Sequence, residues 1–315
     1  MTCRICGNAS QNAVFRAREM MLGTREPFSY VQCSRCRCLQ IEHIPTDLSP
    51  YYPPAYNGFA APRPRPYAGV GGAVRKARYR SAVFPDSPLA GLVNGLMPAR
   101  QYELLGQLGL RRHSRVLDVG CGQGAYLYPL HELGMPHVRG VDPFIPETIE
   151  YPNGYRVEKK FLEEVTGPWD LILFNHSYEH VPDPRQTLQT AARLLAADGT
   201  CLVRIPTVSS WAWQHYGVDW FQLDAPRHLY LHSVESLTLL AGQVGLRVAD
   251  IQYDSDSAQF MYSEKYRRGF AMYEPAPDLY GSRLSRKLKK MAYQRQAETL
   301  NRQHLGDQAA FVLKK

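Results

Sequence analysis

A glycine-rich turn is the first stretch of this sequence whose residue types could do chemistry. Residues 118–124 read DVGCGQG, and the first two of them end the short apolar run Val116–Val119. The glycines of the turn are Gly120, Gly122 and Gly124. Glycine removes the side chain that would keep a backbone away from a ligand. A helix expected to begin at Ala125 would point its free N–H groups at the same place. The turn therefore predicts a binding place for a nucleotide-type ligand.

Two acidic residues accompany the turn. Asp118 lies inside the apolar run, and Asp142 ends the next apolar stretch, residues 137–141. An acid roughly 20 residues after such a turn grips a ribose diol in doubly wound folds. A dinucleotide fingerprint would read G-x-G-x-x-G, whereas glycines here occupy every second position. The spacing therefore differs from that fingerprint, and a glycine turn without any ligand is the alternative to a nucleotide-type site.

Acid–base side chains follow the most apolar predicted strand, Trp169–Phe174. These side chains are Asn175, His176, Glu179 and His180. Ligands of open α/β sheets bind at the carboxyl ends of the strands, so we expect these residues to lie at the reaction site. Arg227 and His228 come from a segment after the next strand, residues 200–205, and are expected to reach the same cleft. Histidine suits a proton acceptor because its unperturbed pKa is roughly 6.5. For either histidine alone, a structural hydrogen-bonding role is the alternative.

Two C-x-x-C pairs near the N-terminus predict a metal site. The four residues are Cys3, Cys6, Cys33 and Cys36. Each pair places two thiolates on one tight turn, and two such turns complete a tetrahedral zinc site. Four thiolates leave no open position, so the expected zinc is structural. Cys38 could replace Cys36 as a ligand, although the C-x-x-C spacing favours Cys36. The alternative to a metal site is a set of unrelated free cysteines.

Strands and helices alternate along the rest of the chain. Strands are expected at 116–119, 137–141, 155–158, 169–174, 200–205, 248–253 and 308–313, and helices at 99–108, 184–195 and after Ser233. This alternation predicts an α/β fold with a mostly parallel sheet. Aromatic residues crowd segment 209–233, which is expected to arch over the cleft and exclude water.

The chain divides into three predicted parts. Residues 1–50 are a zinc-binding module with short strands, and residues 51–95 are a Pro/Gly/Tyr-rich linker rather than a packed element. Residues 96–315 are the catalytic domain, with a basic helical insertion at 254–306. The helical part of this insertion, 282–293, is expected to pack on the domain, and a membrane surface is its alternative partner.

Composition is ordinary for a folded protein that works in water. Of 315 residues, 44% are hydrophobic and 21% charged, and the formal net charge is +8. No window approaches the roughly 18 apolar residues of a membrane span, and the N-terminus lacks the apolar core of a signal peptide. We expect a cytoplasmic protein whose seven cysteines are reduced. The positive charge suggests an anionic partner, or serves solubility alone.

Taken together, these motifs resemble a bacterial family of class I methyltransferases with an N-terminal zinc-binding module. The shared motifs are the two cysteine pairs, Tyr51-Tyr-Pro, residues 118–124, Glu179-His180-x-x-Asp-Pro, Asp224-x-Pro-Arg-His-Leu and Gly306-Asp-Gln. The resemblance implies a Rossmann-like, seven-stranded domain whose last strand runs antiparallel. It implies S-adenosylmethionine as cofactor, with the loop and Asp118 at the amino-acid end and Asp142 at the ribose. Phe161 is the expected adenine contact, and Asn175 and His176 are further cofactor candidates.

The resemblance also implies a small acceptor, such as a nucleotide sugar or glycan of surface-polysaccharide or secondary-metabolite biosynthesis. The chain is similar to deoxysugar C-methyltransferases, in which a histidine at the position of His228 is the base. Those enzymes carry an acid just before that histidine, whereas this chain has Arg227, which would suit an acceptor diphosphate or carboxylate. His180 and Glu179 complete the expected catalytic set.

Two other functions compete with this interpretation. A zinc-module RNA methyltransferase is the runner-up, because the protein is basic. The positive charge lies mostly in the linker and the late helix, however, and the aromatic segment suggests a small acceptor. A zinc-stabilised binding protein without turnover is the third, and the intact glycine turn with Asp142 argues against it.

Overall fold

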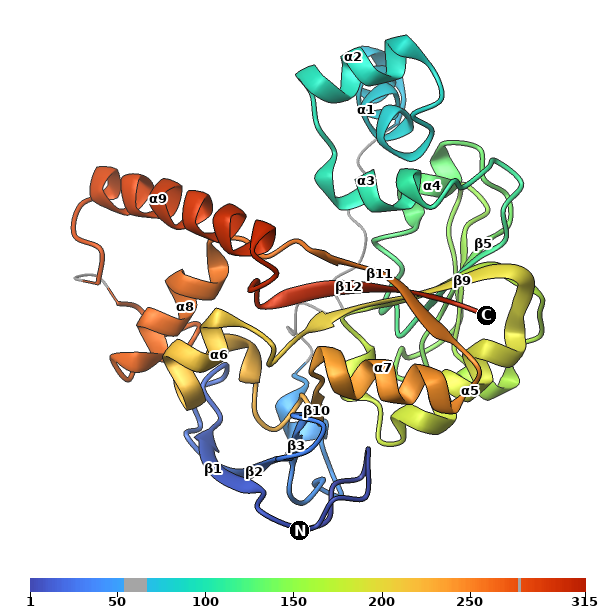
Figure 1. The fold of residues 1–315 in the computed structure, drawn as a ribbon. Coiled ribbons are helices and arrows are strands. Elements are labelled where there is room, and N and C mark those ends of the chain that lie inside the picture. The colour runs from blue at the N-terminus through green and yellow to red at the C-terminus, as the bar shows by residue number, and fades with distance from the viewer. Residues whose placement is uncertain (54–66, 277–278) are drawn as a thin grey trace. The chain divides into compact units, whose positions relative to one another are not determined.

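The computed structural model describes residues 1–53, 67–276 and 279–315 (Figure 1). The chain divides into two compact units. The first unit contains residues 1–53, 174–193 and 200–315. The second contains the described part of residues 54–173 together with residues 194–199. The Pro- and Tyr-rich sequence at 54–66, with Arg63 and Arg65, lies outside the described residues.

The main sheet has the hydrogen-bonded order β11-β12-β9-β8-β4-β5-β7-β6. Its strands are β4 (Val116–Val119), β5 (Val138–Val141), β6 (Ile149–Glu150), β7 (Arg156–Glu158), β8 (Trp169–Asn175), β9 (Leu195–Pro206), β11 (Arg247–Tyr253) and β12 (Gln308–Lys314). β4 pairs in parallel with β5 and β8, and β12 is antiparallel to β9 and β11. All seven predicted strands are present, and the two-residue β6 adds an eighth at the edge. The Rossmann-like α/β class is confirmed.

A smaller sheet in the first unit has the order β1-β2-β3-β10. β1 (Ala13–Arg18), β2 (Pro27–Gln32) and β3 (Leu39–Ile41) come from the N-terminal region, and β10 (Tyr230–Leu231) comes from the segment that carries His228. β10 pairs antiparallel with β3, through Tyr230 opposite Gln40 and Leu231 opposite Leu39. The cysteine-bearing region and the histidine segment therefore share one sheet.

The second unit contains two helices where a linker without packed elements was expected. α1 (Gly69–Val83) and α2 (Pro88–Leu96) precede α3 (Arg100–Gln107), which agrees with the helix predicted at 99–108. The linker expectation was wrong there because the end of α1 is apolar and buries Ala82 and Val83. The helix after the glycine turn was also expected too early: α4 spans only Tyr128–Glu132, with turns from Ala125 to Leu127.

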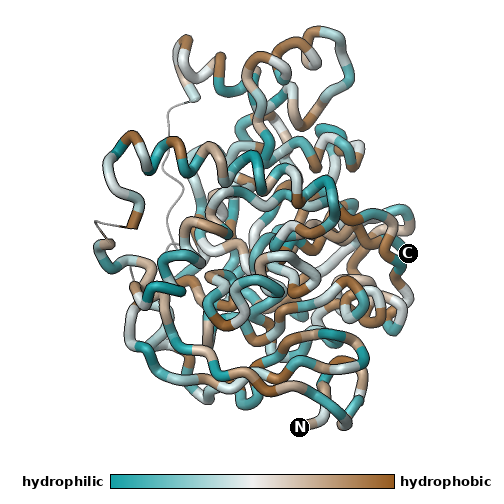
Figure 2. The backbone as a smooth tube through the Cα atoms, turned by 60° about the vertical axis from the view of Figure 1, so that its left-hand side comes forward, coloured by the Kyte–Doolittle hydropathy of each residue, from teal (hydrophilic) through white to brown (hydrophobic). Residues whose placement is uncertain are grey.

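The helices of the first unit are α5 (Pro184–Leu194, continuing into the second unit), α6 (Trp211–Tyr216), α7 (Val234–Gln243), α8 (Ala258–Arg267) and α9 (Arg283–Arg302). α7 begins as predicted, because the Ser233 hydroxyl accepts from the Ser236 N–H at 3.0 Å. Apolar residues gather along the strands near the C-terminus, whereas α9 alternates between apolar and polar residues (Figure 2). Among the described residues, no helix combines the length and apolar character needed to cross a bilayer.

Candidate active site

The glycine turn adopts the backbone conformation that its sequence predicts. Gly120, Gly122 and Gly124 have φ values of +70°, +55° and +78°, a left-handed region that favours glycine. At Gly124 the reason also includes packing, because an added Cβ would lie 2.5 Å from Cγ2 of Val157 and 2.6 Å from Cε1 of Tyr155. The turn therefore fits closely against Val157 of β7 and the ring of Tyr155.

Asp142 connects this turn to the end of β5. Its Oδ2 accepts from the N–H of Gly122 at 2.9 Å, and its Oδ1 accepts from the N–H of Phe144 at 2.8 Å. The carboxylate is almost fully buried, yet each oxygen keeps a further lone pair for a hydroxyl donor. The geometry fits the predicted contact with a ribose diol.

Asp118 is a buried carboxyl group that lacks a partner for one of its oxygens. Its Oδ1 has no hydrogen bond from the described residues, and its side chain is 2% exposed. Burial, with a smaller contribution from Asp142, raises the pKa of Asp118 to about 8. An unsatisfied buried oxygen at the base of a glycine turn suits a ligand with N–H or cationic groups, as the amino-acid end of S-adenosylmethionine has.

Two exposed phenylalanines belong to the same unit as the turn. Phe161, the predicted adenine contact, precedes a short 3-10 helix at Leu162–Glu164 and is 58% exposed. Phe144 is 76% exposed and is fixed at its backbone by Asp142. Sequence reasoning missed Phe144, although its place two residues after the ribose-binding acid was the available signal. Both rings are available to an apolar ligand surface, and the role of Phe161 stays a prediction.

Asn175 and His176 lie at the end of β8 and both contact Arg204 of β9. Nη1 of Arg204 donates to Oδ1 of Asn175 at 3.0 Å and lies 2.6 Å from Nε2 of His176. His176 has a left-handed φ of +54°, and its N–H donates to the Arg204 carbonyl at 2.9 Å. These contacts orient the residues just before Glu179. A role for Asn175 and His176 in cofactor binding stays a prediction.

Glu179, His180 and His228 converge in the first unit. One ligand atom from each lies within 4.8 Å of the others, and the two imidazole centroids are 4.8 Å apart. Nδ1 of His180 donates to the Arg227 carbonyl at 2.8 Å, and Nδ1 of His228 donates to the Gln222 carbonyl at 2.8 Å. A carbonyl can only accept, so each Nδ1 carries the proton. In the neutral form of either ring, the lone pair is therefore on Nε2.

Glu179 lies beside these lone pairs as a fully buried carboxylate. Its Oε1 is 4.0 Å from Nε2 of His228 and 3.6 Å from Nδ1 of His176. Burial by itself would raise the pKa of Glu179, but the contact with His176 and the positive charge of the surrounding histidines when they are protonated outweigh that effect and lower the pKa to about 2. A negative charge on this carboxylate and a positive charge on either histidine therefore favour each other, so Glu179 stabilises the imidazolium that forms when one of the rings takes up a proton.

Arg227 is buried among carboxylates. Its Nε donates to Oδ2 of Asp224 at 2.9 Å and its Nη2 donates to Oε1 of Glu19 at 2.9 Å. Its pKa is raised because these two carboxylates outweigh the effect of burial. An acceptor diphosphate was the expected partner, but the guanidinium is fully buried and its charge is already matched. We therefore interpret Arg227 as a positioning residue, because its carbonyl holds His180.

The N-terminal region supplies three side chains that sequence reasoning did not assign to the site. The Tyr30 hydroxyl donates to the His228 carbonyl at 2.9 Å, and the Tyr52 hydroxyl lies 3.1 Å from Nδ1 of His180. Glu19 pairs with Arg227. The motif Tyr51-Tyr-Pro was the only available signal for Tyr52, and nothing in the local sequence marks Glu19.

The four predicted cysteines come together. Sγ of Cys3 lies 3.6 Å from Sγ of Cys36, and Sγ of Cys6 lies 3.5 Å from Sγ of Cys33. Four sulfurs at about 2.3 Å from a tetrahedral zinc ion would be roughly 3.8 Å apart, so the spacing fits. A hydrogen bond with Cys36 lowers the pKa of Cys3 to about 5, which favours a thiolate. Cys38 instead faces the Leu39 carbonyl and His232.

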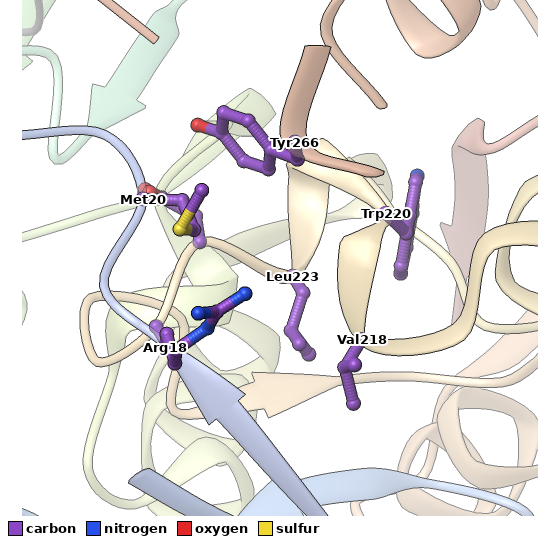
Figure 3. A pocket seen from close by; sticks show the side chains of 8 residues that line it. Arg18, Met20, Val218, Trp220, Leu223 and Tyr266 are labelled. Carbon is purple, nitrogen blue, oxygen red and sulfur yellow. The ribbon is translucent and has the colours of Figure 1, made fainter. Parts of the chain in front are cut away.

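The aromatic segment packs within the first unit more than expected. Trp213 packs edge-on against Phe15, and the Trp220 indole N–H donates to Oδ2 of Asp307 at 3.0 Å. Both tryptophans are buried, so they build the core rather than an open wall. A small pocket lies beside Trp220 and is lined by Arg18, Met20, Val218, Trp220, Leu223, Asp224, Ala225 and Tyr266 (Figure 3).

Comparison with known proteins identifies a domain family in this chain. A family model described as a methyltransferase domain matches residues 96–251. This chain carries a class I S-adenosylmethionine-dependent methyltransferase domain. The matched residues of the methyltransferase domain include the glycine turn, Asp142, Glu179, His180 and His228. The cysteine cluster and α9 lie outside them.

Similar proteins include ubiquinone biosynthesis O-methyltransferases. That of Maricaulis maris is 28% identical over 185 residues, which are 52% of this chain and 72% of the relative. That of a Caulobacter species is 35% identical over 102 residues, which are 28% of this chain and only 39% of the relative. A solved mycolic acid cyclopropane synthase is 19% identical with a TM-score of 0.44, and the match covers 77% of this chain and 95% of that one.

Proposed function

We propose that this chain transfers a methyl group from S-adenosylmethionine to a hydroxyl group of a small acceptor. The observation that carries the proposal is the pair of histidines whose Nδ1 protons are held by backbone carbonyls beside a buried carboxylate. This arrangement leaves two Nε2 lone pairs as proton acceptors. The names of the relatives, which are O-methyltransferases, support transfer to oxygen rather than carbon.

The glycine turn and the acidic and aromatic residues of the second unit have the chemistry that the cofactor requires. Asp118 would meet its amino-acid end, Asp142 would accept from the ribose hydroxyls, and Phe161 or Phe144 would cover the adenine. Bound S-adenosylmethionine supplies an electrophilic methyl group. The protein must then align the acceptor, keep water out and remove one proton.

Nε2 of His228 or of His180 takes the proton from the acceptor hydroxyl. Glu179 stabilises the resulting imidazolium, because its carboxylate remains ionised next to both rings. Arg227, Asp224 and Glu19 hold the loop that carries His228. In this proposal Glu179 is not the base, because its low pKa makes it a poor proton acceptor.

The acceptor that we propose is sugar-linked, from the resemblance to sugar-modifying methyltransferases. Incubation with labelled S-adenosylmethionine and separate pools of nucleotide sugars, lipid-linked glycans, quinone precursors and RNA tests this. We expect label in the sugar-containing pools. Label confined to quinone precursors would reassign the acceptor, and label in RNA would favour the runner-up function.

The base is tested by single variants assayed against the best pool. His228→Ala and His180→Ala should each slow turnover, one of them by about 10²- to 10⁴-fold, with unchanged cofactor affinity. His113→Ala, at an exposed position of the second unit, is the matched control. Full turnover in both active-site variants would contradict the assignment.

We also propose that the four-cysteine cluster binds structural zinc. The sulfur spacing and the absence of an open coordination position support this role. Metal analysis of purified protein should give one zinc per chain, and Cys6→Ser should lower that ratio. Retention of one equivalent in the Cys6→Ser variant would exclude the cluster as the site.

A further inference from the structure

The N-terminal half of α9 presents a row of exposed apolar side chains. Leu284, Leu288 and Met291 are 65%, 57% and 48% exposed. Their spacing of four and three residues places them on one face of the helix. The sequence had favoured packing of this face against the domain, and the exposure of all three residues contradicts that expectation.

The packed face of α9 is a different one. Tyr293 stacks on Phe260 of α8 with ring centroids 4.9 Å apart, and Ala297 and Leu300 are buried. Tyr293 follows Met291 by two residues, a turn of about 200° around the helix. The apolar row therefore points away from the unit on which α9 packs, and its exposure is a consequence of how the helix is anchored.

A row of cations runs directly beside the apolar row. Arg283, Lys287 and Lys290 each precede one member of the apolar row by one residue, and all three are exposed. Arg286 and Lys289 add further positive charge, and no acidic residue occurs between 281 and 297. A stripe of leucine and methionine flanked by Lys and Arg is the pattern of helices that lie in a membrane interface.

We propose that α9 docks this surface flat on an anionic lipid bilayer, with the apolar row in the acyl boundary and the cations at the headgroups. Anionic lipids attract basic segments and neutralise them, whereas a second copy of the chain would bring like charges together. RNA would match the charge but would leave the apolar row in water. The proposal does not depend on which acceptor is methylated.

The chemical consequence is a protein held at the bilayer surface. The helix lies outside the matched methyltransferase residues, so it can bind lipid without altering the histidine cluster. An enzyme anchored in this way would meet acceptors that carry a lipid tail where these are concentrated.

Flotation of the full chain with vesicles tests the proposal, using phosphatidylcholine alone and phosphatidylcholine with 30% phosphatidylglycerol. We expect binding to the anionic vesicles at low salt, weakening as ionic strength rises. The variant Leu284→Ser/Leu288→Ser/Met291→Ser keeps every charge and should bind at least tenfold more weakly. Arg283→Gln/Lys287→Gln/Lys290→Gln should lose the preference for anionic lipid.

The matched control removes exposed apolar residues elsewhere. Leu89, Leu92 and Leu96 of α2 are 69%, 62% and 74% exposed, and their triple serine variant should bind vesicles like the unchanged protein. Methylation of a water-soluble acceptor and the melting temperature should be unchanged in the α9 variants, which separates lipid binding from catalysis and folding. The absence of vesicle binding, equal binding by the apolar variant, or binding to RNA alone would overturn the proposal.

Discussion

Nη2 of Arg227 lies 2.9 Å from Oε1 of Glu19, and both side chains are fully buried. Glu19 also accepts from the backbone N–H groups of four consecutive residues, Met21 to Thr24, at 2.8–3.1 Å. One carboxylate therefore shapes the loop after β1 and matches the charge of the arginine next to His228. The N-terminal region thereby takes part in the construction of the proposed catalytic cluster.

Glu19→Gln should destabilise the protein and slow turnover. Loss of the only partner of a buried charge costs about 3–5 kcal/mol, and we expect less here because Asp224 still pairs with Arg227 in this variant. The amide NH2 of Gln also cannot accept from the backbone N–H groups that the Glu19 carboxylate holds. Denaturant unfolding should show that loss, and kcat should fall while cofactor affinity is retained. The exposed Glu163→Gln is the control. If Glu19→Gln were as stable as the unchanged protein, neither the ion pair with Arg227 nor the backbone contacts of Glu19 would contribute to stability.

If His180 is the base, kcat should fall in acid with a midpoint below pH 6.5. Burial, together with the nearby His228, lowers the pKa of His180, so its neutral form persists to lower pH. The pH dependence of kcat measures that midpoint. Glu179→Gln removes a charge that raises this pKa, so the midpoint should move further down. An acid limb that is unchanged in His180→Ala would assign the base to His228.

Stability should decline as the pH falls from about 6.5 towards 4, because of His232. Burial lowers the pKa of this histidine to about 4, so in that range only the unfolded chain takes up its proton. Because the unfolded chain binds more protons than the native state in this range, acidification lowers the free energy of unfolding, on the order of 3 kcal/mol by pH 4. Urea unfolding at several pH values measures it. His232→Gln should flatten the slope in this window, and an unchanged slope would contradict the assignment.

Cofactor binding near pH 7 should release protons from Asp118. Its pKa of about 8 leaves it mostly protonated, and a cationic ligand group nearby would favour the ionised form. Calorimetry of S-adenosylmethionine binding in buffers of different ionisation enthalpy detects that release. Asp118→Asn should abolish it. Asp142→Asn, which alters the ribose contact instead, should weaken affinity but keep the release, and proton release persisting in Asp118→Asn would exclude this carboxyl.

Removing the proposed zinc should disturb the histidine segment as well as the cysteine turns. The Ser233 hydroxyl donates to the Cys36 carbonyl at 2.6 Å, and β10 pairs with β3. Chelation should therefore lower the melting temperature and change the near-ultraviolet signal of the tryptophans in segment 209–233. Loss of metal without either change would show that the two regions are independent.

The sequence was sufficient for features set by local pattern. The glycine turn, Asp142, the strand ends and the cysteine pairs follow from short-range spacing, and the geometry agrees with each. The role of Arg227 could not be predicted from the sequence, because its partner Glu19 is 208 residues away. The linker helices were missed because proline and glycine content outweighed the apolar end of α1. The exposure of the α9 apolar row was equally hidden, since a helix pattern gives a face but not the neighbour that covers it.

Because β10 supplies the fourth strand to the small sheet, residues 1–53 do not form a domain that folds independently of the histidine segment. A shortened protein that began at residue 96, the start of the matched family region, would leave β10 without its partner strand and Arg227 without Glu19, one of its two carboxylate partners. Recombination that exchanged the cysteine region between relatives would likewise have to carry the matching 224–233 segment with it. The two regions are expected to be inherited as a single unit.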